Sequence, residues 1–365
     1  MTRKIDRPFL IAVIVLLVVG FFIFASASFS LLAREGARFS SVAFSQLVFG
    51  IFGGSIALII LSNINYKIWR KHAFYIFIGS VLLTLLVFVP GIGLEYNGAT
   101  RWLSVGPFTF QPAEFLKLGF VMYFASWLVT NRDRLTKSMT TGVISIVAFV
   151  GVVGAILLAQ PDTDTFLVIA AAAIAMFIAA GGRWRDLGIL SIILLIGIAV
   201  IAFSRPYIQE RIATFLDPSL DPQGSSYQIQ QSLIAIGSGE IFGRGFGQSV
   251  QKFNYLPEPI GDSIFSVAAE EFGFVGAVFL VGLFLFFAIR GLRIATRAPD
   301  YFSGLLVVGI VILITSQAFV NIGSMLGLIP ITGLPLPFVS HGGSALFLTL
   351  ASVGVVLNIS KYMRT

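Results

Sequence analysis

The sequence predicts an all-α, polytopic protein that crosses a membrane many times. Of its 365 residues, 57% are hydrophobic and only 11% are charged, whereas soluble domains carry about 25% charged residues. The hydrophobic residues gather in runs close to the roughly 20 residues that a helix needs to span a bilayer. Between these runs Lys and Arg recur in small clusters, as is typical of loops on the inner side of a membrane.

Ten apolar segments are long enough to be interpreted as transmembrane helices. We expect them at residues 9–32, 42–61, 73–90, 113–130, 141–159, 165–181, 187–204, 263–289, 302–328 and 342–360. The first follows a basic head, as a signal peptide would, but its apolar run is longer than the roughly 7–15 residues of such a signal. We therefore interpret it as an uncleaved span.

The positive charges predict the orientation of these helices. With the N-terminus in the cytoplasm, the inner segments hold clusters of Lys and Arg, whereas the short outer loops hold only Arg34, Arg38 and Arg101. Both termini are therefore expected to be cytoplasmic. Most acidic residues fall on the outer side, a bias that topology alone does not require.

Irregular sequence also accumulates on the outer side, at residues 91–112, 205–262 and 329–341. Residues 205–262, between the seventh and eighth spans, form the large extracytoplasmic loop, and loops of that length are usually functional or disordered. We interpret this one as an ordered lobe in which residues 227–242 form a short amphipathic helix at the membrane interface. Residues 1–365 thus form one membrane domain.

Composition excludes several kinds of site. The chain has no cysteine, so it holds no disulfide and no thiolate metal site, and its two histidines are too few for a multi-histidine site. The net charge of +7 comes from basic residues scattered between apolar runs. Membrane topology explains this charge, and we expect no nucleic-acid partner.

Ionisable side chains within or beside the spans mark candidate sites, because charges are costly in a bilayer. Glu114 and Lys117 lie three residues apart at the outer start of the fourth span, so they share one helix face. A substrate site and a purely structural ion pair both fit this pattern. Asp162 and Asp164 form a turn before the sixth span, where a helix N-cap is the common role and a polar site is the alternative.

The glycine-rich residues 237–252 contain Arg244 and Lys252. Exposed backbone N–H groups and two cations suit a pyrophosphate, although flexible loops have the same composition. The segment lacks the strand–loop–helix setting of a P-loop, so no nucleotide is implied.

Three carboxylates mark the eighth span. Asp262 follows an extended segment with two prolines and is expected at the N-cap of the helix. Glu270 lies about 10 Å further along, so its side chain should be protonated, paired or turned to a polar cavity. Because Glu271 points about 100° away, we expect at most one of the two glutamates on that face.

Ser340 and His341 lie in the proline-rich loop before the last span. Both are candidates for hydrogen bonds to a substrate. A re-entrant turn is the alternative, which is tolerated only where protein or water surrounds it.

Five segments together resemble the SEDS family (shape, elongation, division and sporulation), which includes RodA and FtsW. They are NGATRWLSVGPFTFQPAEFLKL, AQPDTDT, YQIQQSLIAIGSGEIFGRGFGQSVQKFNYLPE, DSIFSVAAEEFGFVG and GLPLPFVSHGGSAL. Their order and spacing are those of the family, and the match runs nearly from end to end. The stretch GQSVQKFNYLPE resembles the division type, FtsW, more than RodA.

The resemblance implies a ten-helix fold in the bacterial cytoplasmic membrane. It implies a peptidoglycan glycosyltransferase that polymerises lipid II at the outer face, with a class B penicillin-binding protein and other divisome proteins as partners. It also implies that Asp262 is the catalytic acid, that Glu114 and Lys117 are the family's important pair, and that Arg101 and Asp162 match its loop arginine and the acid of its QPDxGT motif.

The sequence departs from the family at several positions. Ile260 and Gly261 replace the His-Thr before the catalytic acid, and Ser263 replaces the aromatic residue after it. Asp164 stands in place of the QPDxGT glycine, and His341 in place of the Tyr of SYGGS. These changes bear on the support of the acid and on substrate contacts.

The predicted chemistry is attack by a sugar 4-hydroxyl on an anomeric carbon that bears a lipid pyrophosphate. Asp262 would act as general base, with Glu270 in support. Candidates to neutralise the leaving pyrophosphate are Arg101, Lys117, Arg244 and Lys252. A divalent cation, Mg²⁺ or Mn²⁺, held by carboxylates and phosphates stays open as a cofactor.

Two rival functions stay open beside this one, as does a RodA-type role in elongation. A lipid II flippase would also need a polar groove between helices, but it should need a path to the cytoplasmic face, where the loops are short and basic. A scaffold that only recruits the transpeptidase would leave the outer carboxylates unexplained.

Overall fold

The apolar segments form long helices in the computed structural model, which describes residues 4–34, 36–96, 99–105, 108–132, 139–219, 221, 224 and 226–363. The long helices are α1 (Arg7–Arg34), α4 (Lys67–Leu85), α5 (Pro112–Thr130), α7 (Met139–Ala159), α8 (Thr163–Ala179), α9 (Trp184–Ser204), α13 (Ile264–Thr296), α14 (Tyr301–Met325) and α15 (Gly343–Ser360). The second predicted span is built from α2 (Gly36–Phe44), the π-helix η1 (Ser45–Gly53) and α3 (Gly54–Asn63).

Shorter elements fill the connections. They are the 3₁₀-helix η2 (Leu86–Phe88), the strands β1 (Gly93–Tyr96), β2 (Ala99–Val105) and β3 (Phe108–Phe110), and the helices α10 (Pro206–Leu216), α11 (Tyr227–Ser238) and α12 (Gln251–Asn254). The predicted amphipathic helix in the long loop is thus present as α11.

Nine helices in the described part of the chain are long and apolar enough to cross a membrane. The sixth predicted segment, 165–181, forms α8, whose 17 residues are fewer than the roughly 20 that a crossing needs. The prediction of a helical, multi-pass membrane protein is therefore confirmed, and the number of ten crossings stays a prediction.

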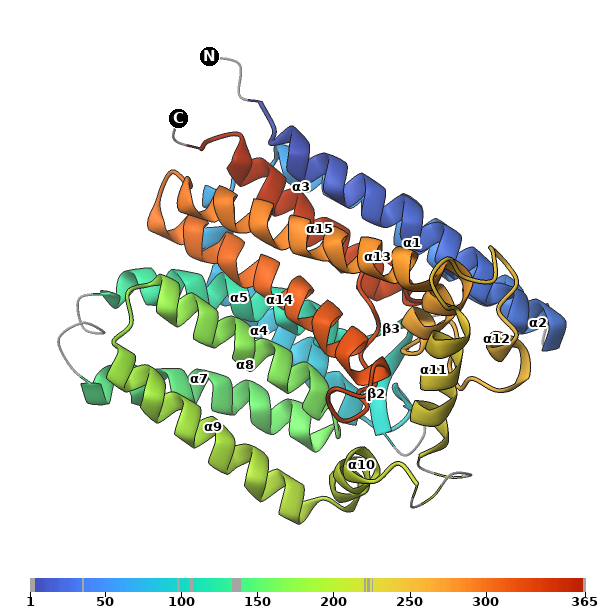
Figure 1. Cartoon of the computed structure of the whole chain (residues 1–365). Helices are drawn as coiled ribbons and strands as arrows, with labels where there is room; N and C mark the ends of the chain where they lie inside the picture. The colour runs from blue at the N-terminus through green and yellow to red at the C-terminus, as the bar shows by residue number, and fades with distance from the viewer. Residues whose placement is uncertain are drawn as a thin grey trace.

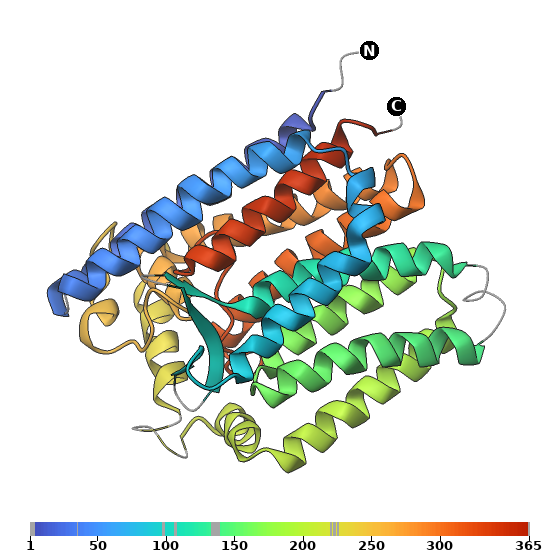
Figure 2. The same cartoon turned by 180° about the vertical axis from the view of Figure 1, so that it is seen from behind.

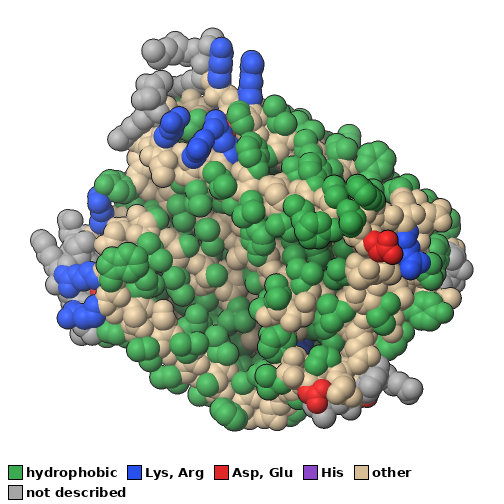
Figure 3. Space-filling model, viewed as in Figure 1, with side chains coloured by type: hydrophobic (Ala, Val, Ile, Leu, Met, Phe, Trp, Pro, Cys, Tyr) green, Lys and Arg blue, Asp and Glu red, His purple; other side chains and the backbone are tan. Residues whose placement is uncertain are grey.

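The two termini lie at the same end of the helix bundle, and the strands with α10, α11 and α12 lie at the opposite end (Figures 1 and 2). Hydrophobic side chains cover much of the face shown in Figure 3, as lipid contact requires, and most Lys and Arg side chains on that face lie toward the end with the termini. The charge pattern in the sequence thus corresponds to one end of the folded molecule.

Residues 91–112, predicted to be irregular, contain a three-stranded antiparallel sheet in the order β1-β2-β3. Leu103 pairs with Gly93 on one side and with Phe110 on the other, and its side chain is buried. The expectation of irregular structure is wrong at this point, and the small sheet is an addition to the helical membrane fold. β2 contains the β-branched residues Thr100 and Val105 and the aromatic Trp102, residue types that favour a strand.

Helix α13 is kinked at Gly273, where φ is +65° and ψ is −166°. The kink frees backbone groups, and the glycine-rich loop before α12 satisfies them. Phe274 N donates to Glu240 O at 2.8 Å, and Arg244 N donates to Glu270 O at 3.0 Å. The loop therefore packs against α13 with its backbone, which explains how a bend is tolerated in a membrane-spanning helix.

Candidate active site

A cavity of about 480 Å³ opens at the end of the bundle that carries the sheet. This size lies within the roughly 300–1,000 Å³ typical of ligand sites. Its walls come from β2, the turn before α8, α10, α11, the loop before α13 and the loop after α14. The polar and charged side chains among its lining are Arg101, Tyr207, Glu210, Arg211, Thr214, Gln228 and Asp262.

Asp262 reaches this cavity from the loop before α13. The helix begins at Ile264 and its N-cap residue is Ser263, so the predicted N-cap position of Asp262 is wrong by one residue. Its Oδ1 accepts hydrogen bonds from Gln228 Nε2 at 3.2 Å and from Ser263 Oγ at 3.4 Å. Burial, opposed by the hydrogen bond from Gln228 and assisted by the charge of Glu258, raises the pKa of Asp262 to about 7.

Ser340 and His341 hold the loop that carries Asp262. Ser340 Oγ donates to Gly261 O at 2.6 Å, and His341 N donates to Ile260 O at 2.7 Å. Neither residue lines the cavity in the described part of the chain. Their contacts hold the two residues that precede Asp262, and a direct contact with substrate stays a prediction.

Arg101 projects from β2 and lines the cavity. Its guanidinium donates to Gln160 O at 3.1 Å and to Pro161 O, so neutral carbonyl groups fix the side chain. Asp162 follows as the N-cap of α8, as predicted, and its Oδ1 accepts from Thr165 N at 3.3 Å. Burial raises the pKa of Asp162, and the charge of Arg101 opposes that shift.

Asp164 pairs with Arg211, a cavity residue that sequence reasoning missed. Arg211 Nη1 lies 3.0 Å from Asp164 Oδ2, which also accepts from Gly333 N at 3.0 Å. Asp164 therefore ties α8 to α10 and to the loop after α14. The carboxylate that replaces the family's glycine thus has a cationic partner on the cavity wall.

Glu114 and Lys117 form the predicted ion pair, with 2.8 Å between Lys117 Nζ and Glu114 Oε1. Both side chains are buried, and Lys117 Nζ also donates to Gln317 Oε1 at 2.6 Å. The pair lines a separate small cavity of about 30 Å³ between α5, α14 and α15. It does not line the cavity that contains Asp262 in the described part of the chain.

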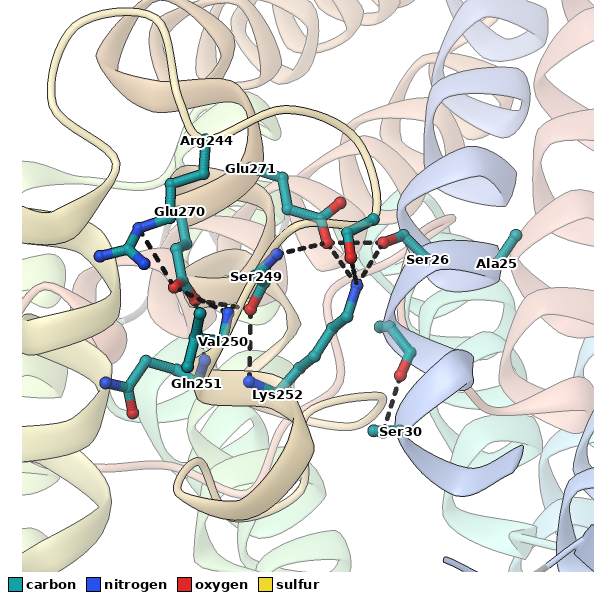
Figure 4. A network of polar contacts seen from close by, with 12 residues as sticks. Ala25, Ser26, Ser30, Arg244, Ser249, Val250, Gln251, Lys252, Glu270 and Glu271 are labelled. Atoms are coloured by element: carbon teal, nitrogen blue, oxygen red, sulfur yellow. Dashed lines mark hydrogen bonds and ion pairs between the residues drawn. The ribbon is translucent and has the colours of Figure 1, made fainter. Parts of the chain in front are cut away.

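Glu270 is fully buried beneath the glycine-rich loop (Figure 4). Its carboxylate accepts from Ser249 Oγ at 2.5 Å, from Val250 N at 3.0 Å and from Gln251 N at 3.3 Å. Arg244 Nε lies 3.6 Å away. Of the three states expected for Glu270, pairing is the one observed, and its partners belong to the loop. Glu270 does not line the cavity of Asp262 in the described part of the chain, so its support of the base stays a prediction.

Glu271 is buried against the same loop (Figure 4). Neither glutamate lines the cavity of Asp262 in the described part of the chain, so the expectation that at most one of the two shares the cavity face stays a prediction. Lys252 Nζ lies 2.6 Å from Glu271 Oε1 and also donates to Ser26 Oγ at 2.8 Å and to Gly247 O at 3.0 Å. The glycine-rich loop curves around the first turns of α13, so it contacts Glu270 and Glu271 although their side chains point in different directions. Lys252 is fully buried, which leaves it no surface for a pyrophosphate.

The described residues bring together no group of three or more His, Cys, Asp or Glu side chains that could hold a metal ion. A divalent cation at Asp262 would therefore depend on phosphate oxygens and water for most of its ligands. The cofactor stays a prediction.

The sequence analysis missed several polar cavity residues, and two of them, Arg211 and Gln228, contact carboxylates of the site. Both project from short helices of the long loop, α10 and α11. The available signal was the amphipathic pattern of these helices, which places polar side chains on the face away from the core. It does not say which polar side chain meets Asp262.

The family model described as "Cell cycle protein", which covers FtsW, RodA and SpoVE, matches residues 7–365. The chain belongs to this family. Stage V sporulation protein E of Bacillus subtilis (strain 168) is 40% identical over 368 residues, covering 100% of each chain. A probable peptidoglycan glycosyltransferase FtsW of Geobacter sp. (strain M18) is 42% identical over 311 residues, covering 85% of this chain and 84% of the relative.

A solved structure shares the fold. It is described as a peptidoglycan synthase complex with coordinated polymerization and crosslinking, and one of its chains superposes with a TM-score of 0.80 at 29% identity, covering 99% of this chain and 98% of that chain. This SEDS protein is therefore a helical, multi-pass membrane protein of the architecture found in that complex.

Proposed function

We propose that this protein is a peptidoglycan glycosyltransferase that polymerises lipid II into glycan strands. The observation that carries the proposal is the placement of Asp262, with a pKa raised to about 7, in one cavity with Arg101 and Arg211. A carboxylate poised near neutral pH suits a general base. Two guanidinium groups suit a diphosphate, which they bind through charge-assisted hydrogen bonds.

The reaction follows from these positions. Asp262 accepts the proton of the 4-hydroxyl of an incoming lipid II, and that oxygen bonds to the anomeric carbon of the growing strand. The bond from this carbon to the phosphate oxygen breaks, and the polyprenyl diphosphate leaves with the electron pair. Arg101 and Arg211 neutralise the charge that develops on it. A base in this role contributes about 10²–10⁴-fold to the rate.

The orientation of the chain belongs to the same proposal. The cavity lies at the end opposite the termini, so cytoplasmic termini would place the cavity at the outer face of the bacterial cytoplasmic membrane. With ten crossings, residues 205–262 would form the extracytoplasmic loop that supplies α10 and α11. Lipid tails would then stay in the bilayer while the sugars meet at Asp262.

The similarity to relatives named FtsW supports a role in septal wall synthesis during cell division. The structural neighbour is a complex that couples polymerization with crosslinking, which supports a class B penicillin-binding protein as partner, together with other divisome proteins. A divalent cation, Mg²⁺ or Mn²⁺, would enter with the diphosphate oxygens, and no step above depends on it.

Purified protein in lipid vesicles with lipid II tests the proposal. We expect glycan strands from the wild type and a loss of at least about 100-fold for Asp262→Asn, which removes the base but keeps the shape. Asp217→Asn is the matched control, because Asp217 is an exposed acid of the same loop that bonds to Ser219. Lipid II movement across the vesicle without strands would identify a flippase instead, and full activity of Asp262→Asn would refute the proposed base.

A further inference from the structure

Three side chains form a closed set of hydrogen bonds at the edge of the cavity. Gln228 Nε2 donates to Asp262 Oδ1 at 3.2 Å and to Ser263 Oγ at 3.0 Å. Ser263 Oγ in turn lies 3.4 Å from the same Asp262 Oδ1. Both donors therefore converge on one oxygen of the carboxylate.

Gln228 comes from a well-anchored helix. It lies in the first turn of α11, whose buried side chains Ile229, Ser232 and Ala235 face the bundle, and Ser232 Oγ contacts Met325 Sδ at 3.4 Å. A polar group carried by a packed helix is held more firmly than one on a loop. Gln228 is therefore placed to fix a neighbour, since its own position is fixed.

The backbone of Asp262 is anchored as well. Asn321 Nδ2, from α14, donates to Asp262 O at 2.7 Å and to Leu334 O at 2.8 Å. Asn321 holds the main chain of Asp262 and Gln228 holds its Oδ1, so rotation of the carboxylate about its side-chain torsions is the main movement left to this residue. The amide of Gln228 controls that rotation.

We propose that Gln228, supported by Ser263, is the positioning residue of the base: it holds Oδ1 of Asp262 and turns Oδ2 toward the sugar hydroxyl. This inference rests on the proposed glycosyltransferase function and adds to it the geometry of proton transfer. The proton moves from the hydroxyl to Oδ2, while Gln228 keeps its own protons and contacts no reacting atom.

The bond also affects the charge of the base. An amide donor stabilises the ionised form of a carboxylate, so Gln228 opposes the effect of burial on the pKa of Asp262. The ionisable groups around the carboxylate are Glu258 on its own loop and, in the cavity lining, Arg101, Tyr207, Glu210 and Arg211. None of these groups is altered by a change at position 228, so a shift in the pH profile would report the loss of the amide.

Ser263 is the second hydrogen-bond partner of Gln228. It occupies the position where the family motif has an aromatic residue, and its side chain is fully buried. An aromatic ring would offer Gln228 no hydroxyl acceptor. The serine therefore adds a second partner that holds the amide in place.

The test measures lipid II polymerisation between about pH 5.5 and pH 9 for the wild type, Gln228→Leu and Ser263→Ala. Gln231→Leu is the matched control, because it replaces another glutamine of α11, about one turn further along and outside the cavity lining. We expect Gln228→Leu to move the rising limb of kcat upward by about one pH unit, with roughly a tenfold loss at pH 6.5 that is partly recovered at pH 9 and with little change in KM. Ser263→Ala should shift the limb in the same direction by less.

An equal loss at every pH, or a wild-type profile for Gln228→Leu, would overturn the inference. If Gln228→Leu melts at a lower temperature than the wild type, the pH profile of Ser263→Ala decides instead, because the smaller alanine side chain fits the space of the serine. The proposed function fails separately: it falls if Asp262→Asn stays active, whereas an inactive Asp262→Asn with a normal Gln228→Leu profile refutes the positioning role alone.

Discussion

The ion pair between Lys252 and Glu271 is the contact whose loss we expect to damage the fold most. Both side chains are buried, with relative exposures of 0% and 1%, and 2.6 Å separates Nζ from Oε1. The ammonium group has two further acceptors, Ser26 Oγ on α1 and Gly247 O in the glycine-rich loop. Lys252→Met keeps most of the side-chain length but removes the charge and all three donor bonds, which leaves Glu271 without its cation.

The magnitude follows from the cost of an unpaired buried charge. Removing one partner of such a pair costs about 3–5 kcal/mol, whereas replacing both partners by apolar groups is often neutral. We expect Lys252→Met to lower the free energy of unfolding by about 3–5 kcal/mol and the double variant Lys252→Met/Glu271→Leu to recover most of this loss. Arg244→Met is the control: Arg244 is 42% exposed and lies 3.6 Å from Glu270, and a pair of that kind contributes about 0–1 kcal/mol.

The assay is thermal unfolding of the purified protein in detergent, followed by tryptophan fluorescence. The chain has four tryptophans and no cysteine, so thiol-reactive dyes give no signal. We expect the apparent Tm of Lys252→Met to fall by roughly 5–10 °C and that of Arg244→Met to change little. A Lys252→Met protein that melts like wild type but no longer polymerises lipid II would refute this reasoning and would restore Lys252 as a ligand of the pyrophosphate.

Three further outcomes are expected. Polymerisation by the wild type should rise with pH around a midpoint near 7, because the raised pKa of Asp262 leaves the base protonated below that pH; a midpoint near pH 4 would contradict this assignment. In steady-state kinetics, Arg211→Gln should raise the KM for lipid II by roughly tenfold, because a charge-assisted contact is lost. Asp164→Asn, which removes the ionic partner of Arg211, should raise the same KM by less. Gly273→Ala should lower the free energy of unfolding by about 1–3 kcal/mol, because a Cβ at this position would contact the backbone of the glycine-rich loop. Gly282→Ala is the control: it lies on the same helix with open space around it, and its melting temperature should equal or exceed that of the wild type.

Features set by neighbouring residues could be predicted from the sequence. The apolar runs predicted the long helices, because a segment of about 20 apolar residues in a bilayer must satisfy its backbone hydrogen bonds internally, as a helix does. The i, i+3 spacing gave the ion pair of Glu114 and Lys117, and the polar turn gave the cap at Asp162. Each of these contacts joins residues within one turn of a helix.

Features that depend on distant residues could not be predicted. The partner of Lys252 on α1, Ser26, is 226 positions away, and no periodicity connects them. Arg211 meets Asp164 across 47 positions. The cavity at Asp262 likewise requires the fold, because its walls come from six separate segments. The resemblance to the family predicts Asp262 as the acid, and the structure shows which side chains lie beside it.

The three carboxylates at the start of α13 differ in the kind of partner each one has. Glu270 and Glu271 lie near Arg244 and Lys252 respectively, so their negative charge is neutralised within the fold. The hydrogen bonds to the carboxylate of Asp262 come from an uncharged amide and an uncharged hydroxyl, which orient it without neutralising it. A carboxylate held this way can gain and lose a proton near pH 7, whereas one paired with a buried cation loses that ion pair if it becomes protonated. The glycine-rich loop therefore stabilises the first turns of the helix through Glu270 and Glu271, whereas Asp262 stays unpaired with a cation, as the proposed role of a general base requires.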